Sequence, residues 1–446
     1  MKLWEKGKIT DQNILAFTVG KDRELDMELA ESDVIGSMAH VIMLESVKLL
    51  SDKEKKSIIK VLLEIHEDII SGEFRIEEGM EDIHSQVEKI LTEKLGEAGK
   101  KIHSARSRND QVLVDLKLFY REQMVRLALL TSELVKVLIE NSEKYREVII
   151  PGYTHLQAAM PSSFGLWFAA YAESLTEDLM FHEGIMEYIN QNPLGSAAGY
   201  GSSFPVNREM TTDLLEFSNL HINSINAQFS RGKTEKFIAA GIGAVAGSIG
   251  KMSMDMTLFM SQNFGFFKLK EELTTGSSIM PHKKNPDVLE LIRAKSARLC
   301  SVYQEVQLLT HNLPSGYHRD FQLLKEIIFP SYQELYSCLN MMIYAVKNLI
   351  ISTDISKDDK YKYIFSVENV NEKVKSGIPF RDAYAQVASE IDKGRFRRLS
   401  NVSYTHTGSI GNLSNSGIAE KLDNVLQKLQ TEKYSGFTNR FINKLM

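Results

Sequence analysis

The sequence predicts a mostly α-helical protein, and three observations support that prediction. Only 9 prolines occur in 446 residues, and none lies in residues 1–150 or 206–280, so no proline interrupts a helix there. Apolar side chains recur at a spacing of three to four residues over long stretches. Runs of alternating β-branched residues are scarce, which disfavours a fold built on sheets.

A long helix is expected between Ser107 and Tyr145, where the apolar spacing holds for roughly ten turns. A second apolar face runs along the same segment. A helix that is apolar on two faces belongs inside a bundle or at a subunit interface. The residues that set the main spacing are Leu113, Leu116, Tyr120, Met124, Leu127, Leu134 and Leu138.

Another helix is expected over Phe237–Gly250, an uncharged stretch rich in glycine and alanine. Each glycine costs a helix up to about 1 kcal/mol relative to alanine, and tight packing over such small residues would offset that cost. The stretch ends at Lys251 and falls short of the ~20 apolar residues that a membrane span needs. We therefore expect a helix of the protein core and no membrane partner.

After Ile351 the segments become shorter and more polar, and Gly377–Arg381 marks a turn before a further helix. These changes predict three domains. They are an N-terminal helical domain over residues 1–106, a central long-helix bundle over 107–350 and a small C-terminal helical domain over 351–446.

Charge and cysteine content narrow the class of protein. The 53 basic and 58 acidic residues give a net charge of −5, so a nucleic-acid partner is not expected. The first residues are basic but lack the apolar core of a signal peptide. Cys300 and Cys338 lie in apolar helical contexts and are predicted to be buried, reduced thiols. The sequence therefore favours a cytoplasmic protein.

The segment Gly276–Asp287 carries the strongest chemical signal. It holds the hydroxyls of Ser277 and Ser278, and it places Lys283 two residues before Asn285. That composition suits a mobile loop that closes over an anion. Taken alone, the two serines would be a helix N-cap pair and the other two side chains a solvated turn.

Further polar segments are spread along the chain. No zinc pattern, Walker loop or dinucleotide fingerprint occurs among them, so no metal or cofactor is expected. The segments are Gly36–Ser37, Glu81–His84, Lys101–Gln111, Pro151–Gln157, and Leu313–Gln322 with Lys325.

In this order the segments resemble those of the fumarase/aspartase superfamily. The run Lys283–Asp287, followed by Leu289–Arg293, is most similar to the argininosuccinate lyase and delta-crystallin branch. The resemblance spans nearly the whole chain. It implies an all-α, three-domain fold whose central long-helix bundle forms the core of a homotetramer, with active sites that combine segments of three subunits.

The reaction that the resemblance implies is a β-elimination. It would cleave a C–N bond of argininosuccinate, a small molecule with three carboxylates, into arginine and fumarate. Such a reaction needs a base for the proton beside a carboxylate, an acid for the leaving nitrogen, and groups that stabilise the dianion formed in between. The alternatives are an adenylosuccinate lyase or another fumarate-releasing lyase, and a non-catalytic crystallin-like structural protein.

The resemblance also implies catalytic roles. Ser277 is the proposed base, which must be activated as an alkoxide or by a neighbour. His155 is the general acid or base, and Glu290 orients it. Lys283 and Asn285 hold the carboxylate on which charge develops. Which of Ser277 and His155 removes a proton, and which donates one, stays open.

Other residues match substrate-binding positions of the family. The cations among them, Arg108 and Lys325, would meet substrate carboxylates. His84 could instead only hold a loop in place. The full set is Ser37, His84, Arg108, Asn109, Thr154, Ser278, Tyr317, Gln322 and Lys325.

The chain departs from the family pattern at four places, the first being Trp4–Lys8, which replaces the family's Trp-Gly-Gly-Arg-Phe and predicts a different arm on the substrate side. His282 stands where glutamine is common and is similar to some adenylosuccinate lyases, so the choice of substrate is least fixed there. Ala105 replaces a glycine before Arg106, which predicts that alanine tolerates the backbone conformation of that position. The stretch Phe229–Glu235 replaces an acidic segment of the family, and the sequence offers no reason for that change.

Overall fold

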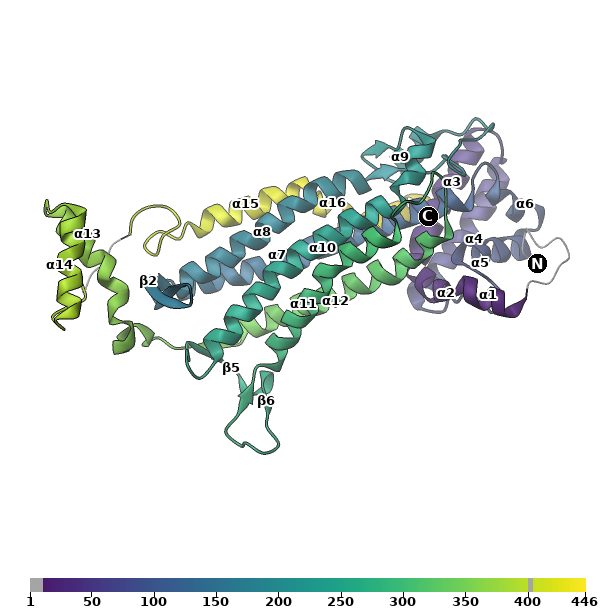
Figure 1. Ribbon diagram of the computed structural model, residues 1–446. Helices are drawn as coiled ribbons and strands as arrows, with labels where there is room; N and C mark the ends of the chain where they lie inside the picture. Colours follow the sequence, from purple (N-terminus) through teal and green to yellow (C-terminus); the bar gives the residue numbers. More distant parts are fainter. Residues whose placement is uncertain (1–10, 400–403) are drawn as a thin grey trace.

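The computed structural model describes residues 11–399 and 404–446, so the family departure at Trp4–Lys8 lies outside the described residues. Figure 1 shows an elongated molecule in which long helices run side by side along most of its length. The strands in the described residues are short and form two-stranded sheets. The predicted mostly helical fold is confirmed.

The helices fall into three groups along the chain. The long helices of the bundle are α7 (Arg108–Lys144), α8 (Phe164–Ile189), α10 (Ser224–Met260), α11 (Asp287–Leu309) and α12 (Leu323–Lys347). One end of the molecule holds α1 (Gln12–Val19), α2 (Asp22–Asp26), α3 (Ala30–Ser46), α4 (Asp52–Ser71), α5 (Ile83–Leu95), α6 (Glu97–Lys100) and α9 (Arg208–Leu214). After the bundle come α13 (Ser366–Lys375), α14 (Phe380–Asp392), α15 (Asn415–Lys428), α16 (Thr431–Ser435) and α17 (Phe437–Leu445).

The strands pair two by two, mostly as connections between helices. Three pairs are antiparallel, and β3 with β4 is parallel. The pairs are β1 (Ile149–Thr154) with β2 (Gln157–Ser163), β3 (Gln191–Asn192) with β4 (Asn219–Leu220), β5 (Phe267–Leu269) with β8 (Leu349–Ile351), and β6 (Thr275–Gly276) with β7 (Lys284–Asn285).

Helix α7 confirms the helix expected at Ser107–Tyr145, because it begins and ends one residue inside that range. The Ser107 hydroxyl accepts the backbone N–H of Asn109, and the Asp110 carboxylate accepts the backbone N–H of Ser107. This reciprocal cap fixes the start of the helix. At 1.5 Å per residue its 37 residues span about 55 Å.

Helix α10 confirms the helix expected at Phe237–Gly250. A Cβ at Gly241 would lie 2.8 Å from Nε2 of His182 in α8, and one at Gly250 would lie 2.9 Å from Cβ of Ser296 in α11. Glycine therefore allows both neighbours to approach closely. By length and hydropathy alone, α10 is the one described helix that could cross a membrane, but half of its apolar window is buried in the molecule.

The same helix is broken near its start. Arg231 (ψ 136°) and Gly232 (φ 76°) leave the helical conformation. Gly232 adopts the left-handed conformation that suits glycine, and its N–H donates to Oε2 of Glu235 at 2.7 Å. The stretch that departs from the family pattern therefore forms a kink and a new helix cap.

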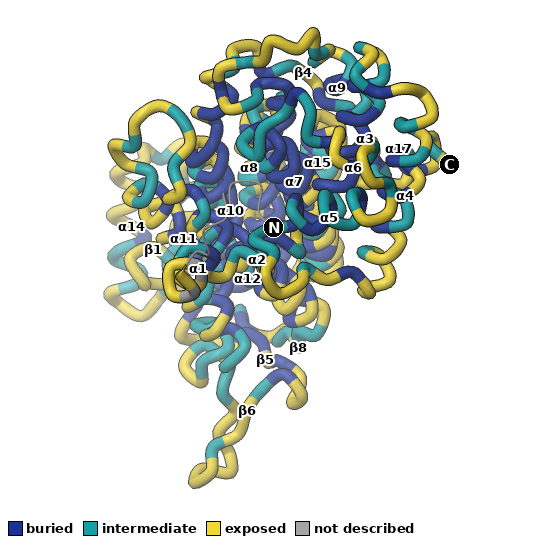
Figure 2. The backbone as a smooth tube through the Cα atoms, turned by 90° about the vertical axis from the view of Figure 1, so that its right-hand side faces the viewer, coloured by how far each residue is buried: buried dark blue, intermediate teal, exposed yellow. Residues whose placement is uncertain are grey.

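The two ends of the molecule differ. Figure 2 shows buried backbone through the centre of the bundle and exposed backbone mainly in the loops and outer helices. Helix α15 runs back along α8, and α17 adds to the apolar core of the α3–α5 end. Helices α13 and α14 pack on each other at the opposite end, around Val370, Ala383 and Val387. The three-domain division stays a prediction.

The two cysteines have different environments. Cys338 in α12 is buried as predicted, but Cys300 in α11 is exposed, so the prediction for that thiol is wrong. Both are free. The apolar neighbours of Cys300 in the sequence point to other sides of α11, and its Sγ lies 3.5 Å from the carbonyl oxygen of Gly243.

Candidate active site

A cavity of about 210 Å³ lies at the α1–α6 end of the bundle. Several predicted substrate-binding residues line it, namely His84, Arg108, Asn109, Tyr317, Gln322 and Lys325. Asp22 and Asp26 also line it, and the sequence interpretation named neither of them. The other charged side chains of the lining lie in stretches that it named without giving these residues a role, and they are Glu81, Asp82, Arg231 and Arg319.

Two helix starts bring His84, Arg108 and Asn109 to the cavity. The Asp82 carboxylate accepts the N–H of Ser85 at 2.7 Å and caps α5, so His84 lies in the first turn of that helix. The cap of α7 places Arg108 and Asn109 in its first turn. Unpaired N–H groups at helix starts favour anions. Both helices therefore contribute to a site suited to carboxylates.

Ala105, just before α7, has a φ of 62°. This is the left-handed conformation, which glycine adopts freely and alanine adopts at a cost. The prediction that alanine tolerates this backbone position is confirmed.

The cations predicted to meet substrate carboxylates already have acidic partners. An Arg108 Nη2 lies 3.1 Å from Glu88 Oε2. Lys325 is buried, lies 2.6 Å from Asp26 Oδ1 and also pairs with Asp22. Burial alone would lower the pKa of Lys325, but the charges of Asp26 and Asp22 raise it. Lys325 therefore stays cationic within a buried ionic cluster.

The two remaining polar residues of this wall connect it to α1. Gln322 Nε2 donates to the carbonyl oxygens of Thr18 and Val19, both at 3.1 Å. Arg319 donates to the Thr18 carbonyl oxygen from Nε and Nη2, at 3.2 and 2.8 Å. Tyr317 is exposed at the rim. The segment after α11 is therefore held against the N-terminal helices.

Ser37 lies apart from the cavity lining. It is buried in α3, and Arg106 Nη1 donates to its Oγ at 3.0 Å. Its hydroxyl is thus used inside the protein, and its predicted substrate contact stays a prediction.

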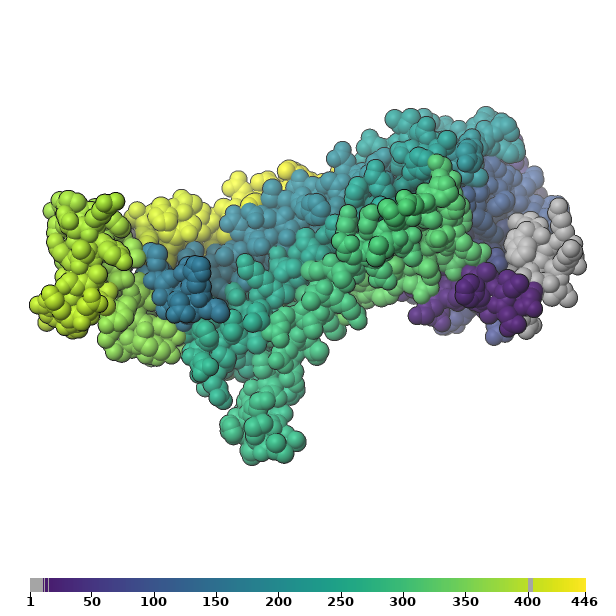
Figure 3. Space-filling model, in the orientation of Figure 1, coloured from purple at the N-terminus to yellow at the C-terminus, as the bar shows by residue number. Residues whose placement is uncertain are grey.

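The predicted catalytic loop forms an arm at the side of the bundle, which Figure 3 shows standing out from the body. Strands β6 and β7 form its stem. At its end, Ser277 Oγ accepts the backbone N–H groups of Met280 and Ile279 at 3.1 and 3.4 Å. Ser278 and Lys283 are exposed on the arm, and the Ile279 side chain is 82% exposed. The neighbouring Met280 is exposed as well, so two apolar side chains lie at the end of the arm.

The other predicted catalytic residues do not lie at the tip of the arm. Asn285 lies in the stem of the arm, and Glu290 and His155 lie outside the arm. Asn285 is in β7, and Glu290 is in the first turn of α11. Thr154 and His155 lie at the exposed tip of the β1–β2 hairpin. His155 and Leu156 have φ values of 54° and 57°, which give the tight turn between the strands.

The predicted site residues therefore form three separate groups within one chain. Arg108 begins α7, whereas the hairpin that carries His155 follows the end of that helix. The length of α7 puts about 55 Å between these two regions. The arm with Ser277 is a third region (Figure 1). Their catalytic and binding roles stay predictions.

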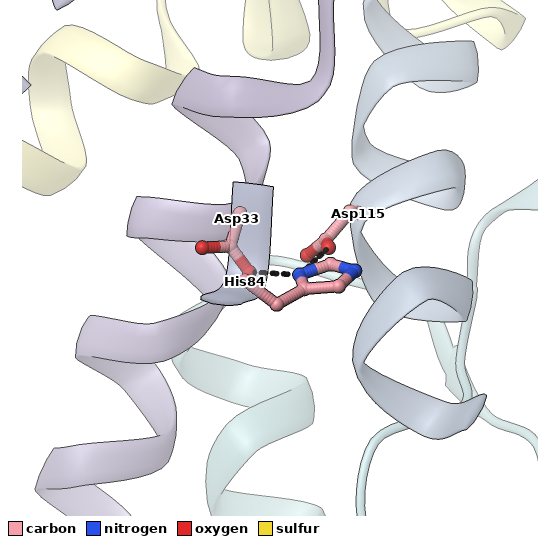
Figure 4. Close-up of side chains that lie close together, drawn as sticks. All are labelled: Asp33, His84 and Asp115. Carbon is pink, nitrogen blue, oxygen red and sulfur yellow. Dashed lines mark hydrogen bonds and ion pairs between the residues drawn. The ribbon is translucent and has the colours of Figure 1, made fainter. Parts of the chain in front are cut away.

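Behind His84 lies a buried acidic pair that the sequence interpretation missed. Figure 4 shows Asp33 from α3 and Asp115 from α7 beside the imidazole. His84 Nδ1 lies 2.8 Å from Asp33 Oδ1 and 3.5 Å from Asp115 Oδ2. Within the described residues, this is the one group of three or more such side chains close enough to share a cation. The position of Asp115 between Leu113 and Leu116 of the apolar face was the available signal.

Comparison with known proteins extends these observations. A family model described as Lyase matches residues 7–300 of the chain. The argininosuccinate lyase of Bacteroides thetaiotaomicron is 54% identical over 95% of this chain and 95% of that protein. The argininosuccinate lyase of Parabacteroides distasonis is 52% identical over 99% of each. That of Thermotoga neapolitana is 40% identical over 88% of this chain and 98% of that protein.

Solved structures share the fold at lower identity. An EDDS lyase in complex with formate has a TM-score of 0.76 and 20% identity, over 97% of this chain and 93% of that one. A fumarate lyase:delta crystallin from Brucella melitensis bound to cobalt has a TM-score of 0.70 and 17% identity, over 91% and 90%. These likenesses confirm the expected fumarase/aspartase-like fold.

Proposed function

The chain belongs to the argininosuccinate lyase family and is a lyase, and on that premise we propose that it cleaves argininosuccinate to arginine and fumarate. The observation that carries the proposal is the 54% identity to an argininosuccinate lyase across 95% of both chains. A match of that extent leaves no large segment for a different active site.

The cavity supports a substrate with several carboxylates. Two helix starts open on it, and Arg108, Lys325 and Arg319 line it. Asp22 and Asp26 also line it, so the site offers acceptors for a cationic group such as a guanidinium. A substrate with both kinds of charge fits this mixture better than a simple dicarboxylate.

The chemistry follows from the predicted roles. One of Ser277 and His155 would remove the proton beside the carboxylate, and the other would donate a proton to the leaving nitrogen. Glu290 would orient the imidazole of His155. Lys283 and Asn285 would stabilise the carboxylate that becomes a dianion. Closure of the arm over the substrate would exclude water and strengthen those interactions.

The separation of the three groups supports a homotetramer with shared active sites. The predicted site residues at the two ends of α7 are too far apart to meet within one chain. If two copies of the chain pack side by side in opposite directions, the end of one α7 lies beside the start of the other. In such an assembly, Ile279 on the arm and Leu156 on the hairpin, both exposed in the single chain, would be covered by neighbouring subunits.

We also propose that this enzyme acts in the cytoplasm.

The test is direct. Purified protein is mixed with argininosuccinate, and fumarate is followed by its absorbance. Adenylosuccinate in a parallel reaction tests the alternative substrate. We expect fumarate from argininosuccinate, and a loss of about 100-fold or more in kcat for Ser277→Ala. No fumarate from argininosuccinate would refute the proposed function, and near-normal turnover of Ser277→Ala would refute the role of that serine.

A further inference from the structure

The buried pair Asp33 and Asp115 has no role in the proposed chemistry, yet it touches a residue of the cavity. His84 lines the cavity and is 4% exposed, whereas Asp33 and Asp115 are both 0% exposed. Three helices, α3, α5 and α7, each contribute one of these side chains. The imidazole of His84 therefore lies between the two carboxyl groups and the cavity.

The two carboxyl groups are not equivalent. Asp33 Oδ1 accepts from His84 Nδ1 at 2.8 Å and from Gln111 Nε2 at 2.6 Å. Within the part of the chain that the structure describes, neither oxygen of Asp115 has a hydrogen-bond partner. Two buried carboxyl groups side by side do not both ionise. One of them must carry a proton, and the arrangement of partners identifies which.

The electrostatics agree with that arrangement. Burial would raise the pKa of Asp33, but His84 and Arg106 lower it. Burial and the neighbouring Asp33 raise the pKa of Asp115 well above its usual range. Asp33 is thus the anion that receives the imidazole N–H, and Asp115 is a neutral carboxyl group.

A hydrogen-bonded proton fits this spacing better than a metal ion. Arg106 is partly buried and interacts electrostatically with both carboxyl groups, so positive charge is already present. A metal ion would also have to separate Nδ1 of His84 from Asp33, which lie at hydrogen-bond distance.

The consequence lies at the other side of the ring. With Nδ1–H given to Asp33, the second nitrogen of His84 points away from that carboxylate, as Figure 4 shows. We propose that Asp33 is a positioning residue that holds His84 so that its Nε2–H donates to a carboxylate of the substrate. Asp33 fixes the ring through Nδ1, whereas Asp115 is only the neutral neighbour of that carboxylate. The proposal rests on the proposed function.

The test compares two asparagine variants. Asp33→Asn removes the anion that fixes Nδ1–H, so Nε2 no longer keeps its hydrogen. We expect the KM for argininosuccinate, and the Kd for fumarate measured by calorimetry, to rise about 10- to 100-fold with a smaller change in kcat. Asp115→Asn exchanges one neutral group for another and should stay within about threefold of the wild type. A merely structural pair would give both variants the same KM.

A double-mutant cycle asks whether Asp33 acts through His84. In a His84→Gln background, Asp33→Asn should change KM by less than about twofold. Fully additive effects would overturn the proposal, and so would a wild-type KM for folded Asp33→Asn. If Asp33→Asn does not fold, His84→Gln alone decides, because wild-type fumarate affinity in that variant also overturns it.

Asp178→Asn is the matched control, since Asp178 is a half-buried carboxyl group of α8 whose pKa burial raises to about 6. It should keep the wild-type KM. The wild-type protein is assayed first. Absence of fumarate release would refute the proposed function, whereas the calorimetric affinities of the variants for fumarate would still test the positioning of His84.

Discussion

At the residue scale, Lys117 is unusual because it is a buried lysine whose hydrogen-bond partners in the described residues are carbonyl oxygens and not carboxylates. Its Nζ lies 3.4 Å from the Ile189 carbonyl oxygen and 5.3 Å from the centre of the Tyr188 ring. Burial lowers the pKa of Lys117 from 10.5 to about 7. The amine is therefore partly neutral at physiological pH.

This residue gives a prediction for stability. Between pH 7 and about 10.5 the unfolded chain keeps a proton on Lys117 that the folded chain has released, so the free energy of unfolding rises with pH across that window. Lys117→Met should remove this rise and stabilise the protein at pH 7 by about 1–3 kcal/mol. Urea unfolding at several pH values measures both effects.

Lys136→Met is the control for that measurement. Lys136 is exposed on the same helix, and its replacement should change the free energy of unfolding by less than about 0.5 kcal/mol at any of these pH values. A Lys117→Met protein that is less stable than the wild type would contradict the prediction.

Single residues also show what the sequence could not give. The resemblance of the chain to the lyase family predicted Lys325 as a cation of the site, and Lys325 does line the cavity. Its partners Asp22 and Asp26 come from about 300 residues away, as the separation of 299 between Lys325 and Asp26 shows. No local pattern connects such residues, so the acidic side of the cavity was missed.

At the element scale, the kink of α10 depends on Gly232. A Cβ at this position would lie 2.7 Å from Cγ2 of Thr310. The backbone of residue 232 also has the left-handed conformation, which is unfavourable for alanine. Gly232→Ala should lower the free energy of unfolding by about 2 kcal/mol or more. Chemical denaturation measures the change.

Gly184→Ala is the opposite case. Gly184 is an exposed glycine of helix α8 with open space around its Cα. Alanine there should stabilise the protein by about 0.5–1 kcal/mol. Equal effects of the two substitutions would mean that α10 is a straight helix in solution.

The contrast between α7 and α10 explains how far the elements could be predicted. Apolar periodicity predicted α7, since that signal is local, and the structure adds the Ser107 cap at the start of the helix. The break in α10 has no such signal, because glycine also occurs at unbroken positions such as Gly241. The β1–β2 hairpin was likewise missed, since each strand is defined by its partner.

At the scale of the whole molecule, the three groups of predicted site residues predict complementation between subunits. His155→Asn and Ser277→Ala should each be nearly inactive alone. If the proposed homotetramer forms, unfolding the two proteins together and refolding them would give mixed tetramers in which about a quarter of the sites receive both intact residues from different subunits. Fumarate release measures the recovery, and light scattering measures the tetramer.

The control is a mixture of His155→Asn with Glu290→Gln, assayed in the same way. Recovery there shows that Glu290 and His155 come from different chains. No recovery in the first mixture, with tetramers intact, would place His155 and Ser277 of each site in one subunit.

The return of α15 along α8 has a consequence for how the chain is made. Asn415 at the start of α15 donates to the Ser142 hydroxyl near the end of α7, 273 residues earlier. At roughly 5–20 residues per second, a ribosome needs about 14–55 s to deliver that partner. During this interval the groove that Ile418, Leu422 and Val425 later fill stays open. The nascent bundle therefore exposes apolar surface for most of its synthesis, and its last step is the docking of residues that leave the ribosome late.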